Sequence, residues 1–479
     1  MFNMFISLFF LTICFVFFSV FRLWEHPQST SRFMSDDAKD IDLPNKGGEG
    51  KSITIVGGGI SGLSAAKYLL EAGFKVTLLE ERNIMGGNND PYLEDGQHSA
   101  TTVIITFPSQ QPHYLKLCRE LNLTQTPHEF SNLEGAIVLK DRLFKARMGA
   151  GMWVFVKAIL KQCSIRELID GILITLLFYR QFRWRPESKE SVKDLLGSRL
   201  VGSSAFTHVF MPWIGINTWC RFDDIDVQPA HVFGSFIFEY ALATTTRFSD
   251  YHKGENGWCV LDGRLIHALE KHLKTFSGYT HHVNAKVANV DRAEDKLIIK
   301  TENGDQYYSD KLLCATQPFQ ALPLIEKVAV PSLISELKKW PKMDCYVVLH
   351  TDFHAIKKMP WLHQTHLNKT NQKNYITNTI KPIMSDVEVK YVITFVYNTI
   401  NYKDFINHHI DSDKIIKIYE PKLPIFTLEN SINRNMTWNN IDSECKDIYW
   451  TQACRSGLQY HNNGILSSKR VVRSILNSI

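Results

Sequence analysis

The sequence lacks the features that mark several classes of protein. Its nine cysteines are scattered and never form a CxxC pair, which argues against a zinc site or a disulfide framework and favours free thiols in a reducing compartment. The net charge is only +5, and no basic block or RNA-binding aromatic motif occurs, so we expect no nucleic-acid partner. We also expect no metal site, because no histidines, cysteines or carboxylates have metal-ligand spacing.

Charge is missing altogether from the start of the chain. Met1 to Phe21 has no charged side chain and is dominated by phenylalanine. About 20 such residues in a helix cross the hydrocarbon core of a bilayer. A cleaved secretory signal is the alternative, but it would want a cationic first region and small residues before a cleavage site. We therefore predict an N-terminal transmembrane helix within residues 1–24, a single-pass membrane localisation with a cytoplasmic catalytic domain, and a linker at 25–50.

Glycines gather after the linker, at the end of an apolar run. Gly57, Gly59 and Gly62 form a G-x-G-x-x-G pattern between an expected strand, 53–56, and an expected helix, 62–72. A second strand, 75–79, ends in Glu80. In such a unit the glycines permit a tight turn and close approach to a pyrophosphate, the helix N-terminus attracts phosphate, and the acid suits ribose hydroxyls. The stretch therefore predicts a dinucleotide-binding βαβ unit.

The next residues favour FAD over NAD. The stretch "EERNIMGGNND" resembles the E-x-R-x-x-x-G-G-R motif of FAD enzymes in the amine oxidase and phytoene desaturase superfamily, with Asn88 in place of the last arginine. The resemblance implies that the acid and the first arginine hold the ribose side, and that the paired glycines pass beneath the pyrophosphate. It implies non-covalent FAD as cofactor, bound by residues from both motifs: Gly57, Gly59, Ile60, Ser61, Gly62, Glu80, Glu81, Arg82, Gly86, Gly87 and Asn88.

Two later segments join the same resemblance. "HHVNAKVANVDRAEDKLIIKTENGDQYYSDKLLCATQP" is similar to the strand pair and closing strand of the flavin fold, which implies that Val287 approaches the adenine and Ala315 the flavin. Alternation in 296–301 independently predicts a strand, and Asn303-Gly304 a hairpin turn. At the C-terminus we expect Asn463 to cap a helix from Gly464 to Ile479. In the resembled fold that helix points its N-terminus at the flavin, which implies contacts from Asn463, Gly464 and Ile465.

A narrower resemblance extends over most of the chain from Lys51 onward. The stretches "VIITFPSQQPHYLKLCRELNL", "VVLHTDFHAIKKMPW" and "LQYHNNGILSSKRVV" are similar to flavin-dependent, amine-oxidase-like proteins that accompany cyclopropane or methylated fatty-acid synthesis. Their last motif reads F-H-E-D-G-x-x-S-G, and Asn462 and Asn463 stand here for the two acids. His461 stands where amine oxidases often place a residue facing the flavin. It is our candidate catalytic residue, with a plain structural histidine as the alternative.

The resemblance also implies an architecture. We expect an α/β protein with a Rossmann-like FAD-binding domain of the glutathione-reductase type and a discontinuous α+β substrate domain. The FAD-binding domain is predicted at 51–125, 255–318 and 435–479, and the substrate domain at 126–254 and 319–434. Within the latter, Ile165 to Tyr179 has apolar residues at helical spacing. It predicts a core helix, with a helix at a lipid interface as the alternative.

The function implied is an FAD-dependent oxidoreductase. We expect it to oxidise or desaturate a hydrophobic substrate, an acyl lipid or an isoprenoid, by hydride transfer to flavin N5. A true amine oxidase is one alternative. A flavin-binding protein without redox turnover, such as an isomerase that uses the cofactor electrostatically, is another.

Overall fold

The computed structural model describes most of the chain after residue 40, and the residues from Leu43 to Ile479 form one compact unit. The described residues are 41–89, 92–94, 97–100, 112–123, 134–139, 142–147, 161, 163–184, 188–211, 226–235, 264–352, 362–367, 375–380, 392–397, 406, 410–431, 434–457 and 459–479. The predicted anchor at 1–24 lies outside them. Within these ranges, none of the helices is both long enough and apolar enough to cross a bilayer.

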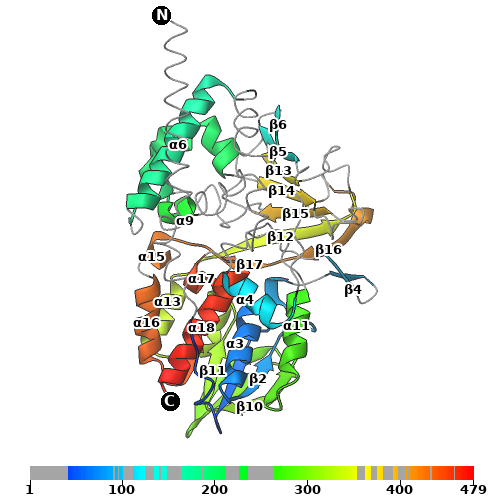
Figure 1. Ribbon diagram of the computed structural model, residues 1–479, viewed down its shortest axis with the longest axis vertical. Helices are drawn as coiled ribbons and strands as arrows, with labels where there is room; N and C mark the ends of the chain where they lie inside the picture. The colour runs from blue at the N-terminus through cyan, green and yellow to red at the C-terminus, as the bar shows by residue number, and fades with distance from the viewer. Residues whose placement is uncertain are drawn as a thin grey trace, which may run out of the picture. The chain divides into compact units, whose positions relative to one another are not determined.

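A five-stranded parallel sheet forms the centre of one half of this unit (Figure 1), with the strand order β18-β11-β1-β2-β7. Its strands are β1 (Ser52–Val56), β2 (Lys75–Leu79), β7 (Tyr279–His282), β11 (Lys311–Cys314) and β18 (Ile448–Trp450). They come from all three stretches predicted for the FAD-binding domain, although the exact predicted boundaries stay predictions. Strands of a parallel sheet are buried on both faces, and consecutive residues of β1 and β11 are buried accordingly.

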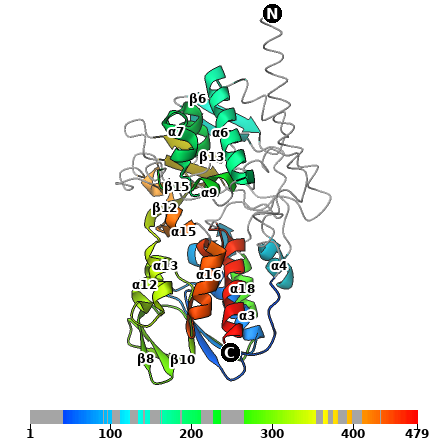
Figure 2. The same ribbon diagram turned by 90° about the vertical axis from the view of Figure 1, so that its left-hand side faces the viewer.

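Helices cover one face of the parallel sheet and a smaller sheet covers the other (Figure 2). Helix α3 (Ile60–Glu71) packs between α18 (His461–Asn477) and α11 (Arg264–Leu273). On the opposite face lies the antiparallel sheet β10-β9-β8, formed by Gln306–Ser309, Lys296–Thr301 and Val287–Ala293. The strand predicted at 296–301 and the turn at Asn303-Gly304 are confirmed, with Gly304 at a φ of 91°.

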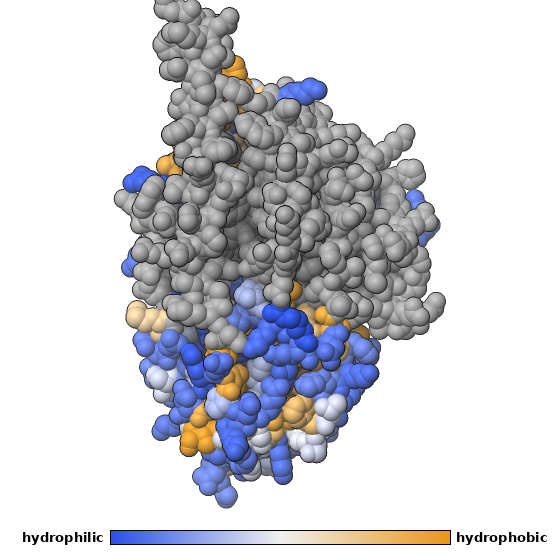
Figure 3. Space-filling view, viewed as in Figure 1, coloured by the Kyte–Doolittle hydropathy of each residue, from blue (hydrophilic) through white to orange (hydrophobic). Residues whose placement is uncertain are grey.

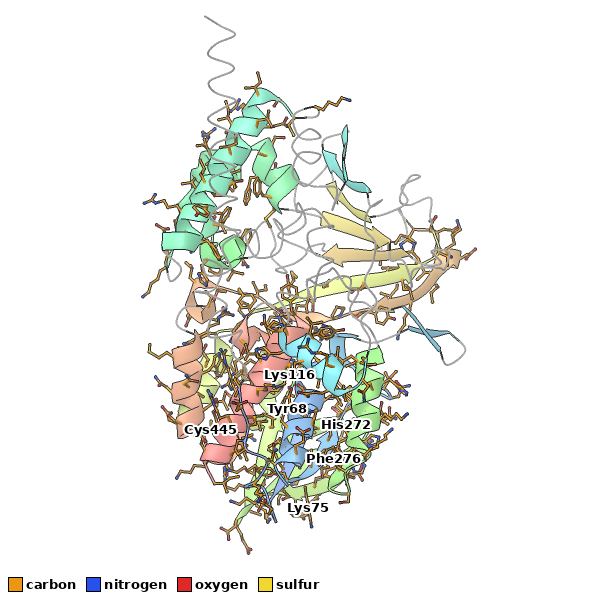
Figure 4. The ribbon with its side chains drawn as sticks, in the orientation of Figure 1. Tyr68, Lys75, Lys116, His272, Phe276 and Cys445 are labelled. Atoms are coloured by element: carbon orange, nitrogen blue, oxygen red, sulfur yellow. The ribbon has the colours of Figure 1, made fainter. Side chains whose placement is uncertain are left out.

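The contact between α3 and α18 is polar as well as apolar. Tyr68 of α3, labelled in Figure 4, receives the Lys469 ammonium of α18 at 5.5 Å from its ring centroid. The preceding residue of α18, Ser468, donates its hydroxyl to the Ser61 carbonyl oxygen over 2.7 Å. These contacts fix the two helices side by side, so that their first turns lie together.

Further helices surround this core. They are α4 (Pro112–Glu120), α12 (Pro318–Ile325), α13 (Pro331–Lys338), α15 (Leu428–Ser431), α16 (Arg434–Glu444) and α17 (Ala453–Ser456). A buried ion pair joins α16 to α17, because the Arg455 guanidinium contacts the Asp442 carboxylate and also donates to the Trp450 carbonyl. Figure 3 shows that the described surface of this half is mainly hydrophilic.

The other half contains a larger, antiparallel sheet with the order β13-β14-β15-β12-β16, to which β17 adds beside β12. The strands are β12 (Lys342–His350), β13 (Leu362–Leu367), β14 (Tyr375–Ile380), β15 (Val392–Tyr397), β16 (Ile415–Tyr419) and β17 (Lys422–Pro424). Two hairpins, β3-β4 (Tyr92–Glu94, Gln97–Ala100) and β5-β6 (Glu134–Leu139, Arg142–Arg147), complete the strands of the described residues.

A group of helices accompanies this sheet: α6 (Ile165–Trp184), α7 (Val192–Val201) and α9 (Ala230–Ser235), with a π-helical turn at Phe206–Phe210. Phe178 of α6 stacks on Phe233 of α9 with the ring centroids 6.1 Å apart. The helix predicted from Ile165 is confirmed and extends five residues further than expected, to Trp184.

Candidate functional site

The site begins at the turn between β1 and α3, where two glycines are needed for different reasons. Gly57 has a φ of 108°, which is accessible to glycine but strained for other residues. At Gly62 a Cβ would stand 1.9 Å from the Gly57 carbonyl oxygen, so any side chain there would push the helix off the turn. The result is a helix that starts directly at the carboxyl end of a buried strand, with its first N–H groups at that edge of the sheet.

Glu80 lies at the neighbouring strand end and is 5% exposed. One carboxylate oxygen accepts from the Gly58 N–H over 2.7 Å, and the other accepts from the Arg82 N–H over 3.0 Å. The Arg82 Nε lies 3.5 Å from the same carboxylate. Glu80 therefore fixes the glycine turn to the end of β2 and presents a buried negative charge there.

The second glycine pair packs against the first. The Gly86 N–H donates to the Gly58 carbonyl over 2.9 Å, and a Cβ at Gly87 would stand 2.9 Å from the Gly59 Cα. The Arg82 guanidinium donates to the Gly87 carbonyl over 2.7 Å and so holds this segment in place. Glu81 and Asn88 are both exposed.

Two more predicted residues lie at the same edge of the sheet. Ala315 follows β11 and donates its N–H to the Val56 carbonyl over 2.8 Å, beside the glycine turn. Val287 begins β8 and is buried, and the segment before it is tied to the Glu80 region because the Ala285 N–H donates to the Glu80 carbonyl over 2.8 Å. The structure thus brings residues from 51–125 and 255–318 to the carboxyl ends of the parallel strands, where nucleotides bind in open α/β sheets.

Helix α18 completes the site, but it begins earlier than the sequence suggests. The expected cap at Asn463 is wrong: the helix starts at His461, with Tyr460 as the N-cap residue, so Asn463 lies within the first turn. Gly464 lies against α3, because a Cβ there would be 2.9 Å from the Ser61 hydroxyl. Ile465 is fully buried beneath.

The side chain of Asn462, in the first turn of α18, serves a different helix. Its side-chain oxygen accepts from the His113 N–H over 2.9 Å and from the Tyr114 N–H over 3.4 Å, so it caps the first turn of α4 rather than its own helix. The first turns of α3, α4 and α18 therefore lie close together. None of these three turns contains an acidic residue.

His461 is buried at this meeting point and 7% exposed. Its ring lies edge-on to the Tyr114 ring, with the centroids 5.9 Å apart. Nε2 has no hydrogen-bond partner among the described residues. Burial lowers the pKa of His461 to about 4, because removal from water disfavours the imidazolium. The side chain is therefore neutral at pH 7.

The residues present fit FAD. The Ser61 hydroxyl is buried in the glycine turn and has no partner in the described part of the chain. It stands beside a free helix N-terminus, where a diphosphate would accept from it and from the first N–H groups. Ile60 and Gly59 border the same turn, and the buried Glu80 carboxylate offers oxygens to ribose hydroxyls. A buried hydroxyl without a partner costs about 1–3 kcal/mol, which a bound phosphate oxygen would remove.

Sequence reasoning missed three contributors: Asn462 as a cap on α4, Tyr114 as the neighbour of His461, and Ser468 as the link to Ser61. The first two join residues that are hundreds of positions apart. The Ser468 contact was open to inference, because in helical geometry Ser468 lies one turn after Gly464 on the face that meets α3.

Comparison with known proteins agrees with this geometry. The family described as flavin containing amine oxidoreductase matches residues 60–370. The 15-cis-phytoene desaturase of Arabidopsis thaliana is 40% identical over 319 residues, which cover 61% of this chain and 51% of that protein. The chain thus spans about half the length of this relative, and a similar share of the corresponding Oncidium enzyme.

Solved structures share the fold at low sequence identity. A protein assigned as a protoporphyrinogen oxidase from Exiguobacterium sp. 255-15 superposes with a TM-score of 0.62 at 16% identity, covering 90% of this chain and 100% of that one. A CLA-producing fatty acid isomerase from P. acnes superposes with a TM-score of 0.59 at 14% identity, covering 90% and 99%.

The family match spans most of the chain and begins at the first residue of α3, directly beside the glycine turn. The glycine turn, Glu80 and the start of α18 supply what an FAD-binding fold needs. The chain belongs to the flavin-containing amine oxidoreductase family, with the mixed α/β fold of that family and FAD as its cofactor.

Proposed function

We propose that this protein is an FAD-dependent oxidoreductase that oxidises or desaturates an uncharged hydrophobic chain. The observation that carries the proposal is the electrostatic character of the α18 start. The first turns of α3, α4 and α18 have no acidic residue, and burial keeps His461 neutral. An ammonium substrate would find no carboxylate partner at these turns and would meet three positive helix ends.

Bound FAD would supply the acceptor of a hydride from the substrate at its N5 atom. The chain's own groups divide the remaining work. Gly57 to Gly62, Glu80 and Arg82 would hold the nucleotide part. The N–H groups of the first α18 turn would stabilise negative charge that develops beside them. His461 and Tyr114 form a buried aromatic pair that excludes water, and the neutral His461 Nε2 can exchange one hydrogen bond with a polar group of the substrate.

Two comparisons support a hydrophobic substrate. The two relatives reported above are phytoene desaturases, and this supports an isoprenoid as the substrate. The fatty acid isomerase from P. acnes supports the acyl class, because it has the same fold. The association with cyclopropane or methylated fatty-acid synthesis remains a prediction from the motifs. Because the family is described as flavin containing amine oxidoreductase, amine oxidation is the first alternative. The fold shared with the fatty acid isomerase makes a flavin protein without net redox turnover the second alternative.

We further propose that Met1 to Phe21 anchors the protein and that the catalytic part faces the cytoplasm. The uncharged run motivates the anchor, and the scattered cysteines without a CxxC pair, which suit a reducing compartment, motivate the side. Carbonate extraction should leave the full chain in the membrane fraction. Release by carbonate would contradict the anchor, and glycans on Asn122, Asn368 or Asn435 would contradict the cytoplasmic side.

Anaerobic reduction of the flavin tests the substrate class. Purified holoprotein is mixed separately with a neutral isoprenoid such as phytoene, with acyl lipids, and with a panel of primary and secondary amines, and the flavin absorbance near 450 nm is followed. We expect bleaching by an isoprenoid or an acyl lipid and none by the amines. Bleaching by amines alone would contradict the proposal. Product formation without any bleaching would favour the isomerase alternative.

A further inference from the structure

Helix α6 exposes a row of aliphatic side chains. Ile165 is 75% exposed, Ile169 40%, Leu173 39% and Leu176 36%. The spacing of three to four residues puts them on one side of the helix. We call these four residues the α6 stripe. Besides them, Arg166 and Arg180 are the exposed side chains between Ile165 and Phe182.

The α6 stripe does not contribute to the hydrophobic core, because α6 packs against the protein through its opposite side. Ile174 and Phe178 are fully buried there, and Phe178 stacks on Phe233 of α9. A helix on the surface of a soluble protein normally has polar residues facing water. Helix α6 is apolar on both sides, which is typical of a helix with a second apolar environment.

The acidic and basic side chains of α6 also have different environments. Its two acids point toward neighbouring elements: Asp170 is buried and pairs with Arg199 over 2.8 Å, and Glu167 accepts from the Ser204 hydroxyl over 2.8 Å. Between Ile165 and Phe182, where the structure describes the side chains, the two exposed charges are positive: Arg166 at the start of the stripe and Arg180 beyond its end. Aliphatic side chains between cations are the pattern of a helix lying in the interface of an anionic bilayer.

We propose that the α6 stripe rests on a lipid bilayer with anionic headgroups, the four aliphatic side chains entering the headgroup boundary and Arg166 and Arg180 meeting lipid phosphates. The helix group α6, α7 and α9 lies away from the parallel sheet (Figures 1 and 2), so this contact leaves the nucleotide-binding residues uncovered. The uncharged run Met1–Phe21 is an independent indication, from the sequence alone, that the protein meets a bilayer. The contact does not depend on the proposed substrate.

Hydrogen–deuterium exchange on the full chain tests the contact separately from any N-terminal anchor. The holoprotein is measured alone and with vesicles of phosphatidylcholine containing phosphatidylserine. We expect the peptide covering Ile165–Leu176 to exchange at least about fivefold more slowly with vesicles, because an interfacial helix opens less often. Unchanged exchange in that peptide, in protein that sediments with the vesicles, would overturn the proposal.

A variant with Ile169→Gln, Leu173→Gln and Leu176→Gln should lose this protection, while its flavin content and melting temperature stay unchanged. The matched control is Ile418→Gln with Met436→Gln, two exposed apolar side chains outside the stripe, which should keep the protection. Arg166→Gln with Arg180→Gln should weaken it on anionic vesicles. Protection of the stripe by protein concentration alone, without lipid, would replace the bilayer by a second copy of the chain and overturn the proposal.

Discussion

His461 is the residue whose surroundings most restrict the chemistry of the site. It is buried beside Tyr114, it has no described partner at Nε2, and its lowered pKa leaves it neutral. A neutral imidazole can exchange a hydrogen bond or act as a base, but it cannot neutralise a negative charge. We therefore expect its contribution to be positioning or proton acceptance rather than electrostatic attraction of the substrate.

Replacing His461 separates these roles. His461→Ala should slow anaerobic flavin reduction by about 100-fold, the scale of a lost acid–base or positioning group, with FAD content unchanged. His461→Phe keeps an aromatic wall but no hydrogen bond, and should be as slow as the alanine variant. Stopped-flow absorbance gives both rates. If the phenylalanine variant reduces as fast as the wild type, His461 is only a wall, and cavity shape with the flavin remains the source of the rate.

At the scale of elements, Asn462 connects two helices that are far apart in sequence. It caps α4 from the first turn of α18. Asn462→Ala should leave the His113 N–H without its partner and cost about 1 kcal/mol of local stability. Exchange of the α4 amides should then be about fivefold faster by hydrogen–deuterium exchange.

Two further variants complete this comparison. Asn462→Asp retains an acceptor at a helix N-terminus and should restore slow exchange in α4. Asn439→Ala, at an exposed position of α16, should leave α4 unaffected. Equal exchange of α4 in the wild type and in Asn462→Ala would show that the cap does not hold the helix.

The elements that the sequence predicted are those whose signals are local. Strand β2 was predicted to the residue, because the run 75–79 stops directly before the acid Glu80, and two residues, Asn303-Gly304, were enough to predict the hairpin turn. The start of α18 was misplaced, because Asn463 before a glycine suggests a cap, whereas the helix begins at His461 without a side-chain cap. The contact of the neighbouring Asn462 with α4 joins residues 349 positions apart and has no local signal. The sequence predicted α6 as a helix and left a lipid interface as its alternative environment, but it did not show which side is exposed, because a helix that is apolar on both sides has no periodic contrast to orient it.

Across the whole molecule, three buried histidines make stability depend on pH. Burial lowers the pKa of His461 to about 4, of His350 to about 4 and of His231 to about 3. His350 is held neutral between the Thr394 hydroxyl, 2.7 Å from Nε2, and the Asp352 N–H, 3.2 Å from Nδ1. In the unfolded chain all three have an ordinary pKa near 6.5.

The sign of the pH effect follows from these directions. Between pH 6.5 and 4 the unfolded chain binds protons that the folded protein does not, so stability is complete above pH 6.5 and is lost as the pH falls toward 4. One such histidine accounts for about 3 kcal/mol over this window. Urea midpoints of the holoprotein at pH 7, 6 and 5 should therefore decrease, and His350→Gln should flatten the slope. A midpoint independent of pH in this window would contradict the neutral state of these histidines.

The central claim is that Glu80 and the glycine turn hold FAD, and titration of the apoprotein with FAD tests it most directly. Wild-type protein should bind FAD with quenching of flavin fluorescence. Glu80→Ala should weaken binding by about 1–3 kcal/mol, roughly five- to 150-fold, because the Gly58 and Arg82 N–H groups lose their partner and the ribose loses its acceptor. Glu71→Ala removes an ion pair with Lys67 on α3 outside the turn and should bind normally. Failure of the wild type to bind FAD, or equal affinity of Glu80→Ala and Glu71→Ala, would contradict the claim.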